Sequence, residues 1–168
     1  LAAKTKNIKL GTGIMQISAR VPSMTAMTAQ SMDTVSKGRF ILGLGVSGPQ
    51  VVEGLHGASF AKPLSRLRET IEILRIALSG QKLAYEGKHY VLPRPGGEGK
   101  GIRLGQPPRP NLPIYLATLG PKSLQLTGEL ADGWLGTCFI PEHADVFLKE
   151  ISAGAAKAGR SLSDIDIH

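Results

Sequence analysis

The sequence predicts an α/β fold built on a parallel β-sheet. Strand-like and helix-like segments alternate along all 168 residues, which is the pattern of repeated β-α-β units. The segment at 40–45 is apolar without alternation, as in a parallel strand that is buried on both faces. Several predicted strands end in glycine-rich turns, which favours one shared ligand site at the edge where parallel strands end.

The first half of the chain predicts two strands, two helices and a hairpin. A strand at 8–12 precedes a helix whose Met24, Met27, Met32 and Val35 recur at near-helical spacing, so we expect these side chains in the core. The small residues Ala26 and Ala29 of the same helix would let it sit close to a sheet. The basic residue and glycine at 37–38 end this helix, and the strand at 40–45 follows.

A second helix is expected at 64–79, because Leu67, Ile71, Leu74 and Leu78 form one apolar stripe. Residues 83–92 predict a small hairpin that turns at a glycine. The following glycine- and proline-rich segment, 93–113, is expected to form a lid or a wall beside a substrate.

The second half continues the alternation. The predicted elements are a strand at 114–117, a helix at 122–130, a strand at 133–137, a helix at 141–158 and a strand that begins at 165. Cys138 lies at or just past a strand end, where a small buried apolar side chain is expected. A complete eight-stranded barrel needs about 250 residues. The pattern therefore leaves two architectures open, an open doubly wound sheet and a barrel that lacks strands at both ends.

Composition argues against several classes of function. The net charge is +7, but the basic residues are scattered and only 5% of residues are aromatic, so nucleic-acid binding is disfavoured. The single cysteine leaves no internal disulfide and fits a reducing cytoplasm. The sequence has no apolar run of about 18 residues to predict a membrane span, and the histidines lack metal-ligand spacing. The abrupt start at Leu1, just before a strand, suggests a cut edge.

Residues 43–48 read Gly-Leu-Gly-Val-Ser-Gly and match the dinucleotide-binding pattern G-x-G-x-x-G. The context differs from that motif, since the first glycine lies inside the strand and no acidic strand end follows about twenty residues later. The better interpretation is a strand end that opens into a glycine loop, where a flat ring can approach the backbone.

Residues 119–123, Leu-Gly-Pro-Lys-Ser, join a strand to a helix. Gly120 can cap this helix, and Pro121 suits its first position. The N–H groups of Lys122 and Ser123, the Ser123 hydroxyl and the positive helix end then predict an anion site. An ordinary capped helix explains the same residues without a ligand.

Several segments together resemble one known family. They are residues 8–14 (IKLGTGI), 38–45 (GRFILGLG), 47–54 (SGPQVVEG), 85–90 (YEGKHY), 119–122 (LGPK) and 131–134 (ADGW). In this order they resemble the luciferase-like monooxygenase superfamily, and within it the oxidoreductases that use the deazaflavin coenzyme F-420. The resemblance covers nearly the whole chain.

The resemblance implies a partial TIM-like (β/α)8 barrel with terminal strands missing, in which residues 1–168 form a single incomplete domain from about the third strand onward. It implies a non-proline cis peptide between Gly13 and Ile14 behind the ring of the cofactor. The ring would also contact Gln16, Ser47, Gly48 and Gln50. The phosphate-bearing tail would be held by Ala117, Thr118, Leu119, Gly120, Lys122 and Ser123.

The activity implied is hydride transfer between a small organic substrate and coenzyme F-420. Some relatives place a carboxylic acid directly after the fourth strand, where this chain has Gly48-Pro49-Gln50, so Glu53 and His56 become the candidate catalytic residues. The alternatives are an FMN-dependent monooxygenase of the same superfamily and an inactive truncated remnant with little turnover. A cytoplasmic location and a homo-oligomer are expected, without metal, nucleic acid or membrane.

Overall fold

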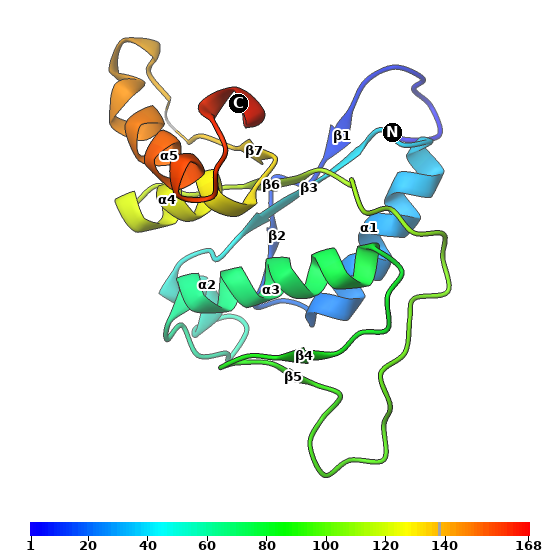
Figure 1. Ribbon diagram of the computed structural model, residues 1–168. Helices are drawn as coiled ribbons and strands as arrows, with labels where there is room; N and C mark the ends of the chain where they lie inside the picture. Colours follow the sequence, from blue (N-terminus) through cyan, green and yellow to red (C-terminus); the bar gives the residue numbers. More distant parts are fainter. Residues whose placement is uncertain (138) are drawn as a thin grey trace. The chain divides into compact units, whose positions relative to one another are not determined.

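The computed structural model describes residues 1–137 and 139–168, so the expectation for Cys138 lies outside the described residues. The chain forms two compact units, each built from separate stretches of sequence (Figure 1). The first unit contains Leu1–Leu10, Gln16–Phe40 and Val46–Leu112. The second contains Gly11–Met15, Ile41–Gly45 and Pro113–His168.

The first unit is built around helix α3, Pro63–Leu78, which confirms the helix predicted at 64–79. The predicted apolar stripe is buried throughout, because it packs against helix α1, Pro22–Ser36. A short helix α2, Pro49–Val52, was not predicted. Strands β4, Tyr85–Glu86, and β5, Val91–Leu92, form the expected antiparallel hairpin beside α3 (Figure 1).

Helix α1 corrects the prediction of its buried face. The exposed fractions of Met24 and Met27 are 50% and 46%, and Met32 and Val35 are exposed as well. The face turned to the interior carries Ala26 and Ala29, which confirms the close packing expected at these two small residues. These small side chains let the helix pack closely, so the methionine spacing marked the helix but not its packed side.

The segment 93–113 is attached to helices of the first unit. It runs beside α1 and the end of α3, where Gln30 Nε2 donates to Pro107 O at 3.3 Å. Arg109 N donates to Leu78 O at 2.7 Å and the Arg109 guanidinium pairs with Asp33 at 2.6 Å. These contacts attach the segment to α1 and to the end of α3. Its role as a lid or a wall beside a substrate stays a prediction.

The parallel sheet gives the second unit its framework. Strands β3, Phe40–Gly45, β6, Ile114–Leu116, β7, Gly133–Trp134, and β8, Asp166–Ile167, pair in that order, and all three pairings are parallel. The short strands β1, Leu10–Gly11, and β2, Met15–Gln16, both pair with β3. The strand order and direction confirm the predicted α/β fold with a parallel sheet.

Helices α4, Pro121–Leu130, and α5, Asp145–Lys157, pack side by side in this unit (Figure 1). A methyl group added at Gly128 would lie 1.9 Å from Ile151 O, and one at Gly154 would lie 1.9 Å from Gln125 O. The two glycines therefore permit the close approach of the helices. The core beneath them is apolar and contains Leu124, Trp134, Ile151, Ala155 and Ile165.

The helix predicted at 141–158 divides into a 3-10 turn, Pro141–His143, and α5. A second 3-10 turn, Leu162–Asp164, leads into β8. Among the described residues, no helix combines the length and the apolar character needed to cross a membrane.

Candidate functional site

The peptide bond between Gly13 and Ile14 is cis, as the family resemblance implied. It follows β1 in the second unit, where Thr12 fastens the chain to β3: the Thr12 hydroxyl donates to Gly43 O at 2.8 Å and accepts from Gly43 N at 3.0 Å. Gly13 is exposed, and no heavy atom in the described part of the chain lies within 4 Å of a methyl group added there. The turn thus presents an open stretch of backbone.

The glycines inside β3 are explained by the chain itself. A methyl group at Gly43 would lie 1.9 Å from Thr12 O, and one at Gly45 would lie 2.8 Å from Ile14 Cδ1. Residues 43–48 therefore match a dinucleotide-binding pattern because β1 and the cis turn press against β3. At Gly43 and Gly45 the close neighbours are atoms of the chain itself. The approach of a flat ring to the loop that follows stays a prediction.

Gln16 and His56 come together in the first unit although 40 positions separate them. The Gln16 side-chain oxygen lies 2.7 Å from His56 Nε2, so the imidazole donates from Nε2 when the amide has this orientation. Gln16 was predicted to contact the cofactor and His56 to act in catalysis. Their hydrogen bond leaves Nδ1 of the imidazole as the nitrogen that can accept or carry a proton.

The loop between β3 and α3 holds the other candidates of this unit. Ser47 adopts a left-handed conformation with φ of 62°, and Gly48 O then accepts the N–H groups of Val51 and Val52 at 3.1 and 3.0 Å. Gln50 is exposed on α2. The Glu53 carboxylate accepts the Phe60 N–H at 3.1 Å, so Glu53 has a structural contact that fixes the loop.

In the turn from β6 to α4, two of the donors predicted for an anion have partners within the turn. Both the N–H and the hydroxyl of Ser123 donate to Gly120 O, at 3.0 and 2.7 Å, so these donors are not free for an anion. Thr118 is buried, and its hydroxyl lies 2.7 Å from that of Thr127. The Thr118 carbonyl accepts the indole N–H of Trp134 at 2.9 Å, so Thr118 is bonded to the core.

Lys122 keeps the character expected of an anion-binding residue. It is exposed at the second position of α4, where the N–H groups of a helix lack partners within the helix. Its ammonium has no hydrogen bond or ion pair with residues 1–137 or 139–168. Leu119 and Gly120 beside it are exposed, and Ala117 is half-buried with its N–H donated to Leu44 O at 2.9 Å.

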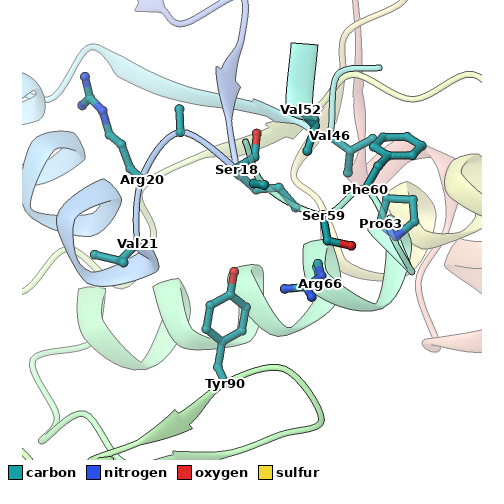
Figure 2. A pocket seen from close by; sticks show the side chains of 13 residues that line it. Ser18, Arg20, Val21, Val46, Val52, Ser59, Phe60, Pro63, Arg66 and Tyr90 are labelled. Carbon is teal, nitrogen blue, oxygen red and sulfur yellow. The ribbon is translucent and has the colours of Figure 1, made fainter. Parts of the chain in front are cut away.

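A pocket of about 340 Å³ lies within the first unit, and the sequence did not predict it (Figure 2). Its walls are largely apolar, from Ile17, Val21, Val46, Val52, Phe60 and Pro63. The polar lining comes from Ser18, Arg20, Ser59, Arg66 and Tyr90. Two of the lining residues follow the hydrogen-bonded pair closely in the sequence: Ile17 comes directly after Gln16, and Ala58 comes two positions after His56. Because its lining comes from four separated stretches, no single motif could have indicated it.

Glu69 positions one side of this pocket. Its buried carboxylate accepts the N–H groups of Lys88, His89 and Tyr90 at 2.9, 2.9 and 3.1 Å, which ties the β4–β5 turn to α3. Burial by itself raises the pKa of this carboxyl, but the three backbone donors outweigh it and hold the pKa below its ordinary value. Tyr90 is thereby held against the helix that carries Arg66.

The described residues contain no group of three or more histidine, cysteine or carboxylate side chains that could hold a metal ion. The donors gathered in the two units are amides, imidazole, hydroxyls, guanidinium and ammonium. Such groups bind and orient an organic molecule and move protons.

Comparison with known proteins places this arrangement in a family. The sequence profile of the luciferase-like monooxygenases matches residues 1–168. The chain belongs to this family. It is 42% identical, over 98% of its length, to a protein of Mycobacterium tuberculosis whose name provisionally assigns it to the coenzyme F-420-dependent oxidoreductases. It is 37% identical, over 99% of its length, to a 5,10-methylenetetrahydromethanopterin reductase of Methanolobus tindarius.

The solved structures support the same fold. The coenzyme F-420-dependent tetrahydromethanopterin reductase from Methanopyrus kandleri matches 99% of the chain with a TM-score of 0.82 and 30% identity. The match covers 50% of that protein, and the two relatives above are covered to 50% and 48%. The chain thus spans about half the length of the relatives it matches, and its sheet corresponds to part of a TIM-like luciferase-like barrel.

Proposed function

We propose that this luciferase-like chain is part of an oxidoreductase that transfers a hydride between an organic substrate and the deazaflavin coenzyme F-420. The observation that carries the proposal is the identity of 42% and 37% to two proteins named for this coenzyme or for a reductase of the same family. The coenzyme supplies the carbon that accepts or donates the hydride when it is bound. The protein positions it, keeps water away and provides proton transfer.

The cis turn fits a flat cofactor ring. The backbone at Gly13 is open, and Ile14 is fixed from behind because its side chain packs on Gly45. A planar ring needs such a surface, which a side chain at Gly13 would obstruct. We assign the Gly13–Ile14 peptide of the second unit to the support of the ring. In the first unit, Gln16, Ser47, Gly48 and Gln50 stay predicted contacts of the ring.

His56 is the better of the two proposed proton-transfer residues. Its Nε2 is occupied by Gln16, which fixes the ring and leaves Nδ1 to take up or release a proton. Glu53 accepts the Phe60 N–H, so one of its oxygens already supports the loop. We therefore propose His56 for proton transfer and Glu53 for holding the loop in place.

Lys122 is the proposed partner of the phosphate on the coenzyme. Its ammonium and its backbone N–H are available, whereas the Ser123 donors are occupied within the turn. Ala117, Thr118, Leu119 and Gly120 then shape the backbone around the phosphate. Because a lone lysine at a helix start provides a modest electrostatic attraction, its removal should weaken binding of the coenzyme without abolishing it.

Anaerobic titration of the 168-residue chain with coenzyme F-420 and with FMN, followed by fluorescence, tests the proposal. We expect tighter binding of coenzyme F-420 and a three- to tenfold weaker affinity in Lys122→Gln, about 0.6–1.4 kcal/mol. Lys149→Gln, an exposed lysine on α5, is the matched control and should bind as the parent does. Tighter binding of FMN would contradict the choice of coenzyme and favour the monooxygenase alternative.

A further inference from the structure

The pocket in the first unit has a specific chemistry in its polar lining. The Ser18 hydroxyl oxygen is shielded from water and has no hydrogen-bond partner in the part of the chain described. A buried hydroxyl without a partner loses the hydrogen bonds that water would provide. A ligand that reaches this hydroxyl would restore one.

Arg66 provides the positive charge of the pocket. Its Nε donates to Ala61 O at 3.1 Å, which orients the guanidinium and leaves the two terminal nitrogens for another acceptor. No acidic side chain is found among the described pocket-lining residues, and Arg66 has no ion pair within residues 1–137 and 139–168. The side chain is half-buried, so its charge is less screened than that of a fully exposed arginine.

Tyr90 and Arg66 face the pocket from the same side. Figure 2 shows both side chains directed toward the pocket, which both residues line. The Arg20 guanidinium points away from them, and it donates to the Thr28 hydroxyl at 3.3 Å. A single cation therefore serves the interior of the pocket, which suits one negative charge.

We propose that this pocket binds a monoanionic carboxylate attached to an apolar body. The carboxylate would accept from the two terminal nitrogens of Arg66, a paired geometry that a planar guanidinium favours. The Tyr90 and Ser18 hydroxyls would donate to the same group or to its neighbour. The apolar body would lie against Val21, Val46 and Phe60. A volume of about 340 Å³ falls in the range of small-molecule sites.

The identification of this ligand as a substrate rests on the proposed oxidoreductase function. The binding site itself does not, because its residues lie within one unit and none of them was assigned to the coenzyme. The experiment can therefore be done without any coenzyme. Its failure would leave the coenzyme titration unaffected, and failure of that titration would leave this result unaffected.

Calorimetric titration of the 168-residue chain with 2-naphthoate, 2-naphthalenemethanol and 2-naphthyl phosphate tests the proposal. The three probes share one apolar body and differ in charge. We expect 2-naphthoate to bind at least tenfold more tightly than the neutral alcohol, a difference of about 1.4 kcal/mol. Equal affinity for the acid and the alcohol would overturn the proposal. Tighter binding of the phosphate would contradict the inference of a single negative charge.

Substitutions inside and outside the pocket show whether 2-naphthoate binds there. Arg66→Gln should reduce the affinity for 2-naphthoate at least tenfold and leave that for the alcohol unchanged, and Tyr90→Phe should reduce it two- to fivefold. Arg103→Gln removes an exposed arginine of the same unit outside the pocket and should have no effect. An unchanged affinity in Arg66→Gln would place the anion elsewhere. Should that variant fail to fold, as shown by circular dichroism, the comparison of probes on the parent chain still decides.

Discussion

Helices α1 and α3 lie against each other in the first unit, yet their sequences relate to their packing in opposite ways. The apolar stripe of α3 is buried as its spacing predicts. On α1 the large apolar side chains are exposed, whereas Gln30 and Asp33 are each only 1% exposed. Both helices have the expected length, so the difference concerns which face packs and not whether a helix forms.

One polar atom of each of the two buried side chains Gln30 and Asp33 has a partner from far along the chain, whereas Gln30 Oε1 and Asp33 Oδ1 have none among the described residues. Gln30 donates to Pro107 O, and Asp33 pairs with Arg109. A polar side chain can be buried when such partners replace water. The segment 93–113 provides these partners, and the small residues Ala26 and Ala29 complete the packed face. The orientation of α1 therefore depends on a contact that periodicity within the helix does not contain.

The largest expected effect is at the centre of the α3 stripe. Leu74→Ala should lower the free energy of unfolding by about 2–5 kcal/mol, because it removes buried methyl groups and leaves a cavity. Leu74 is fully buried. Urea unfolding followed by circular dichroism measures the change, and a loss below about 1 kcal/mol would show that the stripe is not the core of this unit.

The second effect concerns the ion pair of α1. Arg109→Gln should lower the free energy of unfolding by about 1–3 kcal/mol, less than for a fully buried pair because the Arg109 side chain is 41% exposed. The substitution removes the guanidinium and leaves the Asp33 carboxylate buried without its cation. The double variant Arg109→Gln with Asp33→Asn should lose less free energy of unfolding than the sum of the losses in the two single variants. Strict additivity in this double-mutant cycle would contradict a coupled pair.

The third test separates the buried polar residue of α3 from those of α1. The lowered pKa of Glu69 means that its contribution to stability is complete above the ordinary glutamate value, about 4.3, and is lost as the pH falls through the lowered native pKa. Glu69→Gln should therefore reduce stability by about 1–3 kcal/mol at pH 7. The difference from the parent should shrink toward pH 3.

Urea unfolding at a series of pH values gives this profile, and Glu98→Gln, at an exposed position, is the control. A Glu69→Gln difference that stayed constant from pH 7 to pH 3 would show that the three backbone hydrogen bonds do not depend on the negative charge.

The smallest effect is expected on the outer face of α1. Met27→Ser should change the free energy of unfolding by less than about 0.5 kcal/mol, because the side chain is 46% exposed. Thermal unfolding and circular dichroism suffice to detect a larger change. A loss above about 1 kcal/mol would show that the methionines pack against something in solution, and would restore the face that the sequence predicted.

The candidate site shows the same division between local pattern and distant contact. The cis peptide at Gly13–Ile14 was implied by the family resemblance, which rests on residues that stand together in the sequence, and it is present. The hydrogen bond between Gln16 and His56 was not expected, because no spacing rule relates residues 40 positions apart. The hydrogen bonds from Ser123 to Gly120 at the start of α4 were not expected either, and the anion site there stays a prediction.

The sequence alone determined the alternation of strands and helices, the strand at 40–45, the helix stripe of α3 and the family to which these motifs point. These features depend on neighbours within a few positions, because helix and strand periodicity and turn chemistry are local. Only the tertiary structure showed that Gln30 and Asp33 of α1 are buried while its methionines are exposed, and only it revealed the pocket around Ser18 and Arg66. Both depend on which distant groups meet a buried polar atom, and that is settled when the chain packs.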